Sequence, residues 1–323
     1  MIGDLLGGKL PPKPKPKPRA KAVAPTVSAI TESPHCTRVQ DLLMAQQRDG
    51  DVIIQPGQWI RSSSAHKACA RLVHYGRRGL VDVGETFDGA KLFVFAAGTA
   101  YHHAIQNVLL PDTGVLLGWW RCPSCAHVNT GHPSTEWVGF HAIRRPHTCA
   151  ECDWSSPQGC VQPRVCVGST CECRFEYVEL SFRNPDLRLS GHMDGILSWG
   201  DGRELLEAKS IGTGPYGFVA VDPRSGHGPK WEHIIQSHIY MKASGVHRAR
   251  IVYVAKADLP LVNVMAEHVV DFDPALWDDI ELTIRQTVAE LDAPSSAAPA
   301  RALQCTSKGC DMARWCKGKK ECW

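Results

Sequence analysis

The alternation of apolar and polar residues predicts several strands in the second half of the chain. Phe175–Phe182 (FEYVELSF) alternates with a period of two, as a half-buried strand does. Ser190–Ser210 reads as two strands joined by a tight turn at Gly200-Asp201-Gly202, because Asp-Gly between apolar runs is a strong hairpin signal. The β-branched run Arg250–Ala255 predicts a buried strand, and Val262–Val270 predicts another.

Helical patterns alternate with these strands. Their spacing indicates helices over residues 36–50, after the serine cluster Ser62–Ser64, over Ala96–Leu110 with a Gly-Thr start, over Trp231–Met241, and over Asp273–Leu291. Strands that alternate with helices in this way indicate an α/β fold.

Composition describes a globular chain with one unusual end. The 323 residues are 43% hydrophobic and 21% charged, enough for a full α/β core and an inserted subdomain. No apolar run is long enough to span a bilayer, and no secretory signal pattern is present, so we expect a cytoplasmic protein without membrane contact. Residues 1–35 include alternating Lys and Pro and predict a disordered basic tail, either a phosphate-binding segment or a solubilising linker. The net charge is +3, so without this tail the chain is net acidic.

Three charged residues of the predicted hairpin share one face. Glu207 and Lys209 are two residues apart on one strand. If Asp201-Gly202 is a two-residue loop, Asp194 lies opposite Lys209 and diagonal to Glu207, at roughly 7–8 Å. Two carboxylates at this separation can hold Mg²⁺ or Mn²⁺, which activates water, while the ammonium stabilises a phosphate. The alternative is a solvated charged face.

The same segment resembles a known nuclease family. Gly191-His192-Met193-Asp194-Gly195 followed by Glu207-Ala208-Lys209 is similar to the G-H-x-D-G and E-x-K motifs of the RecB-like branch of the PD-(D/E)XK nucleases. Its G-x-x-x-H helix is matched by Gly98 to His102, with His103 as the competing residue. Its Q-x-x-x-Y helix is matched by Gln236 and Tyr240. These motifs occur in the order of the family.

The resemblance implies a fold, a reaction and a set of residue roles. The implied core is restriction-endonuclease-like, a mixed central sheet flanked by helices, and the implied reaction is metal-dependent hydrolysis of DNA. The implied metal ligands are His102, Asp194, Glu207 and the backbone carbonyl of Ala208. Lys209 positions water or stabilises the pentavalent phosphate, and Gln236 and Tyr240 orient Lys209 and contact the DNA backbone.

Most of the 14 cysteines predict metal sites, because disulfides are rare without a secretory signal. Two C-x-x-C pairs suit one structural Zn²⁺ in a zinc-ribbon insertion at 118–175: Cys122, Cys125, Cys149 and Cys152. Three histidines are alternative ligands: His132, His141 and His147. Four further thiols could form a second zinc site: Cys160, Cys166, Cys171 and Cys173.

The C-terminus holds four more thiols, which alone would suit a zinc knuckle. Together with Cys69, close behind Ser62–Ser64, they resemble the [4Fe–4S] staple of RecB-like, AddB-like and CRISPR-associated exonucleases. The resemblance implies four cluster ligands: Cys69, Cys305, Cys316 and Cys322. Cys310 is the alternative to Cys305. The family often spaces the last three as C-x-x-C-x5-C and this chain does not, so the choice between Cys305 and Cys310 stays open.

These expectations divide the chain into five parts: the tail 1–35, a helical part of the nuclease domain 36–117 with the first cluster cysteine, the zinc ribbon 118–175, the catalytic core 176–292 and the iron–sulfur segment 293–323. The expected function is exonuclease action on DNA with free ends or single-stranded flanks, in bacteriophage recombination or DNA processing with a recombination partner protein, in the host cytoplasm. The alternatives are a CRISPR-associated DNA-trimming partner and a non-catalytic nucleic-acid-binding protein on the same scaffold.

Overall fold

The computed structural model describes residues 47–51, 58–78, 84–130, 142–155, 174–200, 202–212, 215–216, 219, 228–256, 265–297 and 299. Predictions that lie outside these residues include the basic tail, the second zinc site at Cys160–Cys173, and the C-terminal thiols of Cys305–Cys322. No helix in the described part is both long and apolar enough to cross a membrane.

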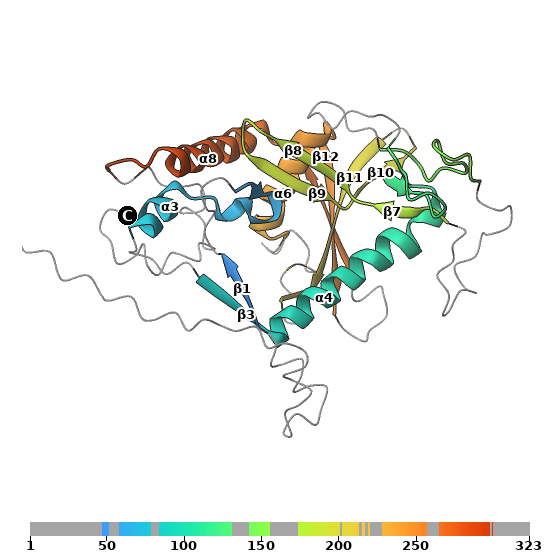
Figure 1. Ribbon diagram of the computed structural model, residues 1–323, viewed down its shortest axis with the longest axis horizontal. Helices are drawn as coiled ribbons and strands as arrows, with labels where there is room; N and C mark the ends of the chain where they lie inside the picture. Colours follow the sequence, from blue (N-terminus) through green and yellow to red (C-terminus); the bar gives the residue numbers. More distant parts are fainter. Residues whose placement is uncertain are drawn as a thin grey trace, which may run out of the picture.

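A mixed five-stranded sheet forms the centre of the molecule (Figure 1). Strand β11 pairs with β12 in parallel, and every other pair in this sheet is antiparallel. The strands, in spatial order, are β13 (Met265–Asp271), β12 (Arg248–Ala255), β11 (Gly202–Ile211), β10 (Gly195–Trp199) and β4 (Leu116–Leu117). The mixed sheet and its helices confirm the α/β class.

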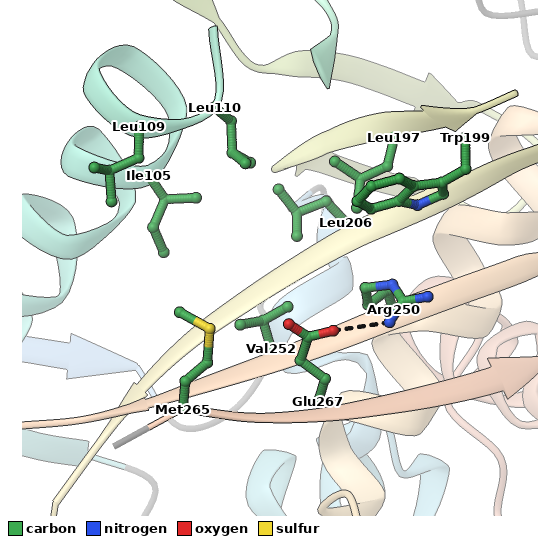
Figure 2. Close-up of a pocket in the computed structure, with 10 residues that line it drawn as sticks. All are labelled: Ile105, Leu109, Leu110, Leu197, Trp199, Leu206, Arg250, Val252, Met265 and Glu267. Atoms are coloured by element: carbon green, nitrogen blue, oxygen red, sulfur yellow. Dashed lines mark hydrogen bonds and ion pairs between the residues drawn. The ribbon is translucent and has the colours of Figure 1, made fainter. Parts of the chain in front are cut away.

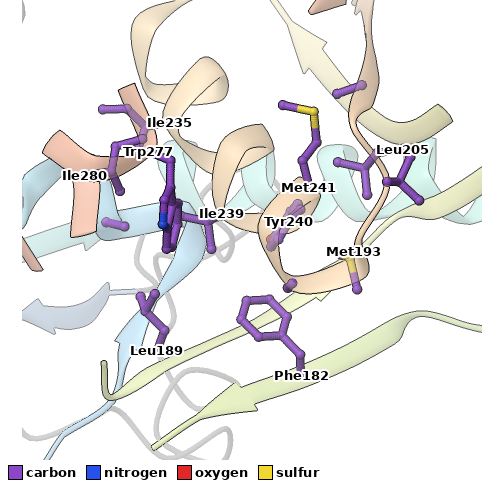
Figure 3. Close-up of a cluster of buried hydrophobic side chains, with 14 of the residues drawn as sticks. Phe182, Leu189, Met193, Leu205, Ile235, Ile239, Tyr240, Met241, Trp277 and Ile280 are labelled. Atoms are coloured by element: carbon purple, nitrogen blue, oxygen red, sulfur yellow. The ribbon is translucent and has the colours of Figure 1, made fainter. Parts of the chain in front are cut away.

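Helices cover both faces of this sheet, because successive residues of its strands point apolar side chains to opposite faces. Helix α6 (Trp231–Ser244) packs on one face and joins α8 (Pro274–Asp292) in the largest core cluster, where Trp277 and Ile239 meet strand residues (Figure 3). Helix α4 (Gly89–His103) continues as the π-helix η2 (Ala104–Leu109). Its Tyr101 and Ile105 pack with residues of the opposite face of the sheet.

Three smaller sheets and three short helices surround this core. One sheet has the order β2 (Ile60–Arg61), β9 (Leu189–Met193) and β8 (Leu180–Asn184); a second has β6 (Val128–Asn129), β5 (Trp119–Arg121) and β7 (Glu176–Val178); the third pairs β1 (Gln47–Asp51) with β3 (Gly84–Asp88). The short helices are η1 (Ser62–Lys67), α3 (Ala70–Arg77) and η3 (Pro111–Thr113).

Several predicted elements differ from those observed. Residues 47–51 form β1, so the helix predicted over 36–50 is wrong in this part. Ser62–Ser64 lie inside the 3₁₀-helix η1 and do not cap an α-helix. Helix α4 begins at Gly89 and not at Ala96, because the carboxylate of Asp88 accepts a bond of 2.8 Å from the Lys91 amide and caps the earlier turn. The helix predicted over Asp273–Leu291 is confirmed, with Asp273 as its N-cap.

The β10–β11 hairpin has a different register from the one predicted. Trp199 pairs with Gly202, so the loop consists of Gly200 and the residue after it. Gly200 has φ of +57°, the left-handed conformation that glycine adopts without a steric cost. Because Gly202 belongs to the strand, the register places Asp194 level with Glu207 rather than with Lys209. The loop keeps an even number of residues, so both carboxylates still point to one side.

Candidate metal-dependent active site

Asp194 occupies the point where the chain leaves one sheet for another. It lies between β9 and β10, and its backbone carbonyl accepts bonds from Gln106 Nε2 at 3.0 Å and from the Tyr177 hydroxyl at 2.9 Å. Its side-chain Oδ2 accepts a bond of 2.7 Å from the amide of Ala208 on β11. These three donors fix both the backbone and the carboxylate of a buried acid. The single strand predicted here is divided by this junction.

His102, in the last turn of α4, contacts the same carboxylate. Its Nδ1 lies 3.0 Å from Asp194 Oδ1. The hydrogen bond to Asp194 raises the pKa of His102, and burial only partly opposes this effect. His103, the competing residue in the sequence, is exposed. The structure therefore brings together the Asp194 and His102 side chains that the motifs single out.

Glu179 also belongs to this group, although the sequence reasoning missed it. The three side chains of His102, Glu179 and Asp194 each place one ligand atom within 4.8 Å of the others. Burial raises the pKa of the Glu179 carboxyl, and the Asp194 charge raises it further. Glu179 was overlooked because Phe175–Phe182 reads as one continuous strand, whereas the structure interrupts it at Glu179, between β7 and β8. Because polar residues alternate with apolar ones along this segment, no local signal distinguished Glu179 from Glu176 or Ser181.

Glu207 and Lys209 form an ion pair on β11. The Glu207 side chain is 1% exposed and that of Lys209 is 22% exposed. Burial, and next the Asp194 charge, raise the pKa of Glu207 to about 7 although Lys209 lowers it. Burial lowers the pKa of Lys209, but Glu207 and Asp194 outweigh this effect and raise it. Lys209 is thus held as an ammonium beside the carboxylates.

The donor set fits a divalent cation. The converging group offers one imidazole and two carboxylates, from His102, Glu179 and Asp194, and these are ligand types that such ions bind in proteins; Glu207 is not a member of this group. The buried Oε2 of Glu207 has no hydrogen-bond partner within the described residues, and Oε1 has only the Lys209 ammonium; an under-satisfied buried carboxylate is costly. Burial is the main cause of the raised pKa of Glu179 and Glu207 and the Asp194 charge adds to it; a cation bound at Asp194 would relieve this added repulsion.

Gln236 and Tyr240 lie behind the strands. Gln236 Nε2 donates to the Tyr240 hydroxyl at 2.9 Å, and both side chains are buried. Among the described residues no hydrogen bond joins either one to Lys209. A Cβ on Gly191 would lie 2.9 Å from Tyr240 Cε1 and 2.4 Å from Ser62 Oγ, so only glycine fits there. Tyr240 therefore packs against β9, the strand that leads to Asp194.

The four cysteines of the two C-x-x-C pairs form one cluster. Cys122 Sγ lies 3.8 Å from Cys152 Sγ, and Cys125 Sγ lies 3.7 Å from Cys149 Sγ. These separations match the edge of a tetrahedron of thiolates about 2.3 Å from a central Zn²⁺, which is roughly 3.8 Å. All four Sγ atoms lie within 4.8 Å of one another. His147 is not in this group, and His132 and His141 lie outside the described residues.

Neighbouring backbone amides prepare the cysteine cluster for a metal. Burial raises the pKa of Cys149, but the amides of Glu151 and Cys152 outweigh it and lower the pKa to about 6. Asn129 on β6 accepts a bond of 2.9 Å from the Ala150 amide and so ties the two pairs together. A thiolate is the form that binds metal, so this environment suits a closed structural site.

The chain after α8 returns along α3 toward Cys69. Arg78, just past the end of α3, donates to the carbonyl of Ser295 at 3.2 Å, and Arg71, in its first turn, donates to that of Pro299 at 2.5 Å. Cys69 is the N-cap residue of α3 and is buried. The linker therefore runs antiparallel to α3, and by Pro299 it has reached the end of α3 where Cys69 lies.

A separate pocket of about 290 Å³ lies between η2 and the central sheet (Figure 2). Leucine, isoleucine, valine and methionine side chains make up most of its wall. Its charged residues, Arg250 and Glu267, are ion-paired with each other at 2.8 Å. None of the site residues described above lines this pocket, so it is not the catalytic centre.

Comparison with known proteins yields partial structural similarity to exonucleases. The alkaline exonuclease LHK-Exo from Laribacter hongkongensis is 25% identical over 36% of this chain and 58% of that protein, with a TM-score of 0.29. A phage-related exonuclease from Haemophilus somnus 129PT is 15% identical over 32% of this chain and 55% of that protein, with a TM-score of 0.28. This chain thus spans little more than half the length of these exonucleases. No protein-family model and no curated protein matches the sequence.

Proposed function

We propose that this chain is a metal-dependent DNA exonuclease of the RecB-like PD-(D/E)XK type that acts in phage DNA recombination or processing. The observation that carries the proposal is the convergence of Asp194, His102 and Glu179 beside the Glu207–Lys209 ion pair. Buried carboxylates with raised pKa values, next to an ammonium, are suited to a cation and a phosphate, and not to a neutral substrate.

Each residue has a distinct part in this function. His102, Asp194 and Glu207 would hold Mg²⁺ or Mn²⁺ together with Glu179 and, as the family resemblance implies, the Ala208 carbonyl. The ion would supply a water of lowered pKa and neutralise phosphate charge. Lys209 stays protonated, so its ammonium orients the phosphate and stabilises the charge that develops on it. The Gln236–Tyr240 pair keeps β9 in place beneath Asp194.

A structural Zn²⁺ in the four-cysteine cluster accompanies this function. The ion would hold the two C-x-x-C turns together, with all four positions filled by protein ligands, so it would stabilise the fold and bind no substrate. Strand β5 leads directly into Cys122 and pairs antiparallel with β7, whose last residue precedes Glu179. The zinc ribbon would therefore also support the strand that leads to the metal ligand.

We also propose a [4Fe–4S] cluster that includes Cys69. The linker reaches the Cys69 end of α3 at Pro299, and Cys305 follows six residues later. Six residues span at most about 20 Å, so Cys305 is in reach of Cys69. Cys316 and Cys322 would supply the remaining ligands, with Cys310 as the alternative to Cys305. Closing a loop between such distant positions would stabilise the nuclease domain.

The direct test is digestion of end-labelled linear DNA with Mg²⁺. Asp194→Ala and Lys209→Ala should each lower the rate at least about a hundredfold, because each removes a group that contacts the ion or the phosphate. His102→Ala should do the same, whereas His103→Ala, which removes the exposed neighbour, should leave the rate unchanged. Full activity of Asp194→Ala or Lys209→Ala would contradict the site. DNA binding without any cleavage by the wild-type chain would favour a non-catalytic scaffold.

A further inference from the structure

The N-terminal half of α4 presents large apolar side chains to solvent. Phe93 is 64% exposed and Phe95 is 48% exposed, with Val94 between them at 51%. Large exposed apolar side chains this close together on one helix make α4 a candidate binding element. Residues two apart on a helix point in different directions, so the two phenylalanines lie on different sides of α4.

Phe95 is on the side of α4 that carries His102. The two residues are seven apart, which is about two turns and roughly 10.5 Å along the helix. Gly98 lies between them on the same side, and a Cβ there would be 3.4 Å from Ser210 Oγ, next to Lys209. This side of α4 therefore passes the end of β11 that carries the ion pair, and Figure 1 shows α4 crossing the strands of the central sheet.

The Phe95 ring is braced by its surroundings. Phe87 on β3 meets it edge-to-face, with ring centroids 5.3 Å apart and an interplanar angle of 85°. An aromatic ring that is held in place loses little conformational entropy when a flat ligand stacks on it. Every nucleobase has a flat π-face, so such a ring binds single strands without a sequence preference.

The charges beside Phe95 suit a phosphodiester strand. Lys256 Nζ donates to the Val94 carbonyl at 3.1 Å, and an ammonium has further donors for a phosphate. Lys91 is one turn from Phe95, with its ammonium 4.5 Å from the Phe87 ring centre. The sequence has no Asp or Glu between Asp88, the N-cap of α4, and Asp112. A strand that follows α4 meets no helix carboxylate before it reaches the metal ligands.

We propose that Phe95 stacks on a base at the single-stranded end of the DNA, that Lys256 contacts the adjoining phosphate, and that this surface guides the strand toward His102 and Asp194. The inference rests on the proposed nuclease function and adds to it a path for the substrate. Phe93, on another side of the same helix and at least as exposed, has no part in this path.

Binding is measured first, without cleavage, by fluorescence anisotropy of a labelled single-stranded oligonucleotide in the absence of Mg²⁺. Phe95→Ala should weaken binding about 5- to 100-fold, the range of one lost base stack. Phe95→Leu keeps an apolar contact for Phe87 and should weaken binding similarly, which separates stacking from folding. Phe93→Ala should change binding less than twofold. Equal effects of Phe93→Ala and Phe95→Ala would overturn the proposal.

A substrate with one abasic position, moved nucleotide by nucleotide from the end, identifies the stacked base. At one position, removal of the base should weaken binding by the wild-type chain as much as Phe95→Ala weakens binding of the intact strand. Removal of the same base should not weaken binding by the Phe95→Ala variant any further. Lys256→Met should lower the slope of log affinity against log salt by about 0.7. Mg²⁺-dependent cleavage with binding indifferent to Phe95 would overturn the path and leave the nuclease intact. Phe95-dependent binding without cleavage would support the path and contradict the nuclease.

Discussion

At the scale of single residues, the position of Asp194 depends on groups that are not themselves candidate metal ligands. Its carbonyl oxygen accepts hydrogen bonds from the side chains of Tyr177 and Gln106. Both donors are buried, and both come from elements outside the hairpin. Because Asp194 lies at a junction between sheets, no regular ladder fixes its backbone, and these two side chains take over that role.

Tyr177→Phe should therefore weaken the site as well as the fold. Loss of the hydroxyl leaves the Asp194 carbonyl with one side-chain donor, which should lower the free energy of unfolding by about 1 kcal/mol. We expect the apparent affinity for Mn²⁺, measured by calorimetry, and kcat each to fall about tenfold, since a small displacement of a ligand is costly.

The matched control is Tyr101→Phe, because Tyr101 lies on α4 and makes no described hydrogen bond. This variant should keep both the affinity and the rate. If Tyr177→Phe loses stability alone, with metal affinity and kcat unchanged, the hydroxyl is structural and does not position Asp194.

At the scale of elements, a buried polar cluster joins α3 to the end of α8. Glu290 Oε1 lies 2.9 Å from His74 Nδ1, and Glu290 Oε2 accepts a bond of 2.7 Å from the Ser295 hydroxyl. The charged groups that face this pair are Arg78, which contacts His74 Nε2, and Arg77, which donates to the Glu290 carbonyl. Burial raises the pKa of Glu290, but the donors of Ser295, and then His74, outweigh it, so the pKa is lowered overall.

A lowered carboxyl pKa adds stability at a pH above the unfolded value of about 4.5, and this stability disappears as the pH falls through the folded value. Glu290→Gln should therefore lower the free energy of unfolding by about 1–3 kcal/mol at pH 7. It should also reduce the loss of stability between about pH 5 and pH 3, followed by urea denaturation at each pH.

Glu281→Gln on the same helix is the control for Glu290→Gln. Glu281 pairs with Arg285 one turn away at the surface, so its loss should cost at most about 0.5 kcal/mol. Equal losses in the two variants, or an unchanged acid dependence in Glu290→Gln, would show that the buried cluster does not hold α3 against α8.

The hairpin loop allows a second test at this scale. Gly200 has a positive φ and open space around its Cβ position, so Gly200→Ala adds backbone strain and no clash. We expect a loss of about 1 kcal/mol in the free energy of unfolding. Gly202→Ala, at a strand position with an ordinary contact, should be neutral or slightly stabilising in the same urea titration. The reverse order would contradict the observed register.

At the scale of the whole molecule, two sets of cysteines would tie distant segments together. The four-cysteine cluster joins β5, β6 and the segment at 148–155. The linker after α8 lies along α3 and leads toward Cys69. If both sites hold metal, two independent metal–thiolate sites cross-link segments on the two sides of the central sheet.

Cys69→Ser and Cys122→Ser should separate these two sites. In protein purified without oxygen, Cys69→Ser should lose the iron and the visible absorbance of a cluster while it retains one zinc. Cys122→Ser should lose the zinc and keep the iron, because each closed site needs its four ligands. A colourless wild-type protein that carries only zinc would refute the iron–sulfur cluster.

The sequence by itself determined the elements whose signals are local. The β-branched run Arg250–Ala255 identified β12, the turn signal between two apolar runs identified the hairpin, and the Asp273-Pro274 pair marked the start of α8. The two C-x-x-C pairs predicted one four-thiol group, because each pair brings two sulfurs together within a single turn. Motif spacing also singled out His102 and Asp194, which the fold places in contact.

Only the tertiary structure decided the features that depend on long-range packing. Glu179 entered the site because β7 and β8 belong to different sheets, and no local pattern reveals that break. The hairpin register followed from Gly200, whose backbone conformation is set by the pairing on both sides. The donors to Asp194 come from η2 and β7, and their convergence requires the sheets to pack first. Residue spacing encodes local geometry, whereas a site built from four separate segments exists only once the core has formed.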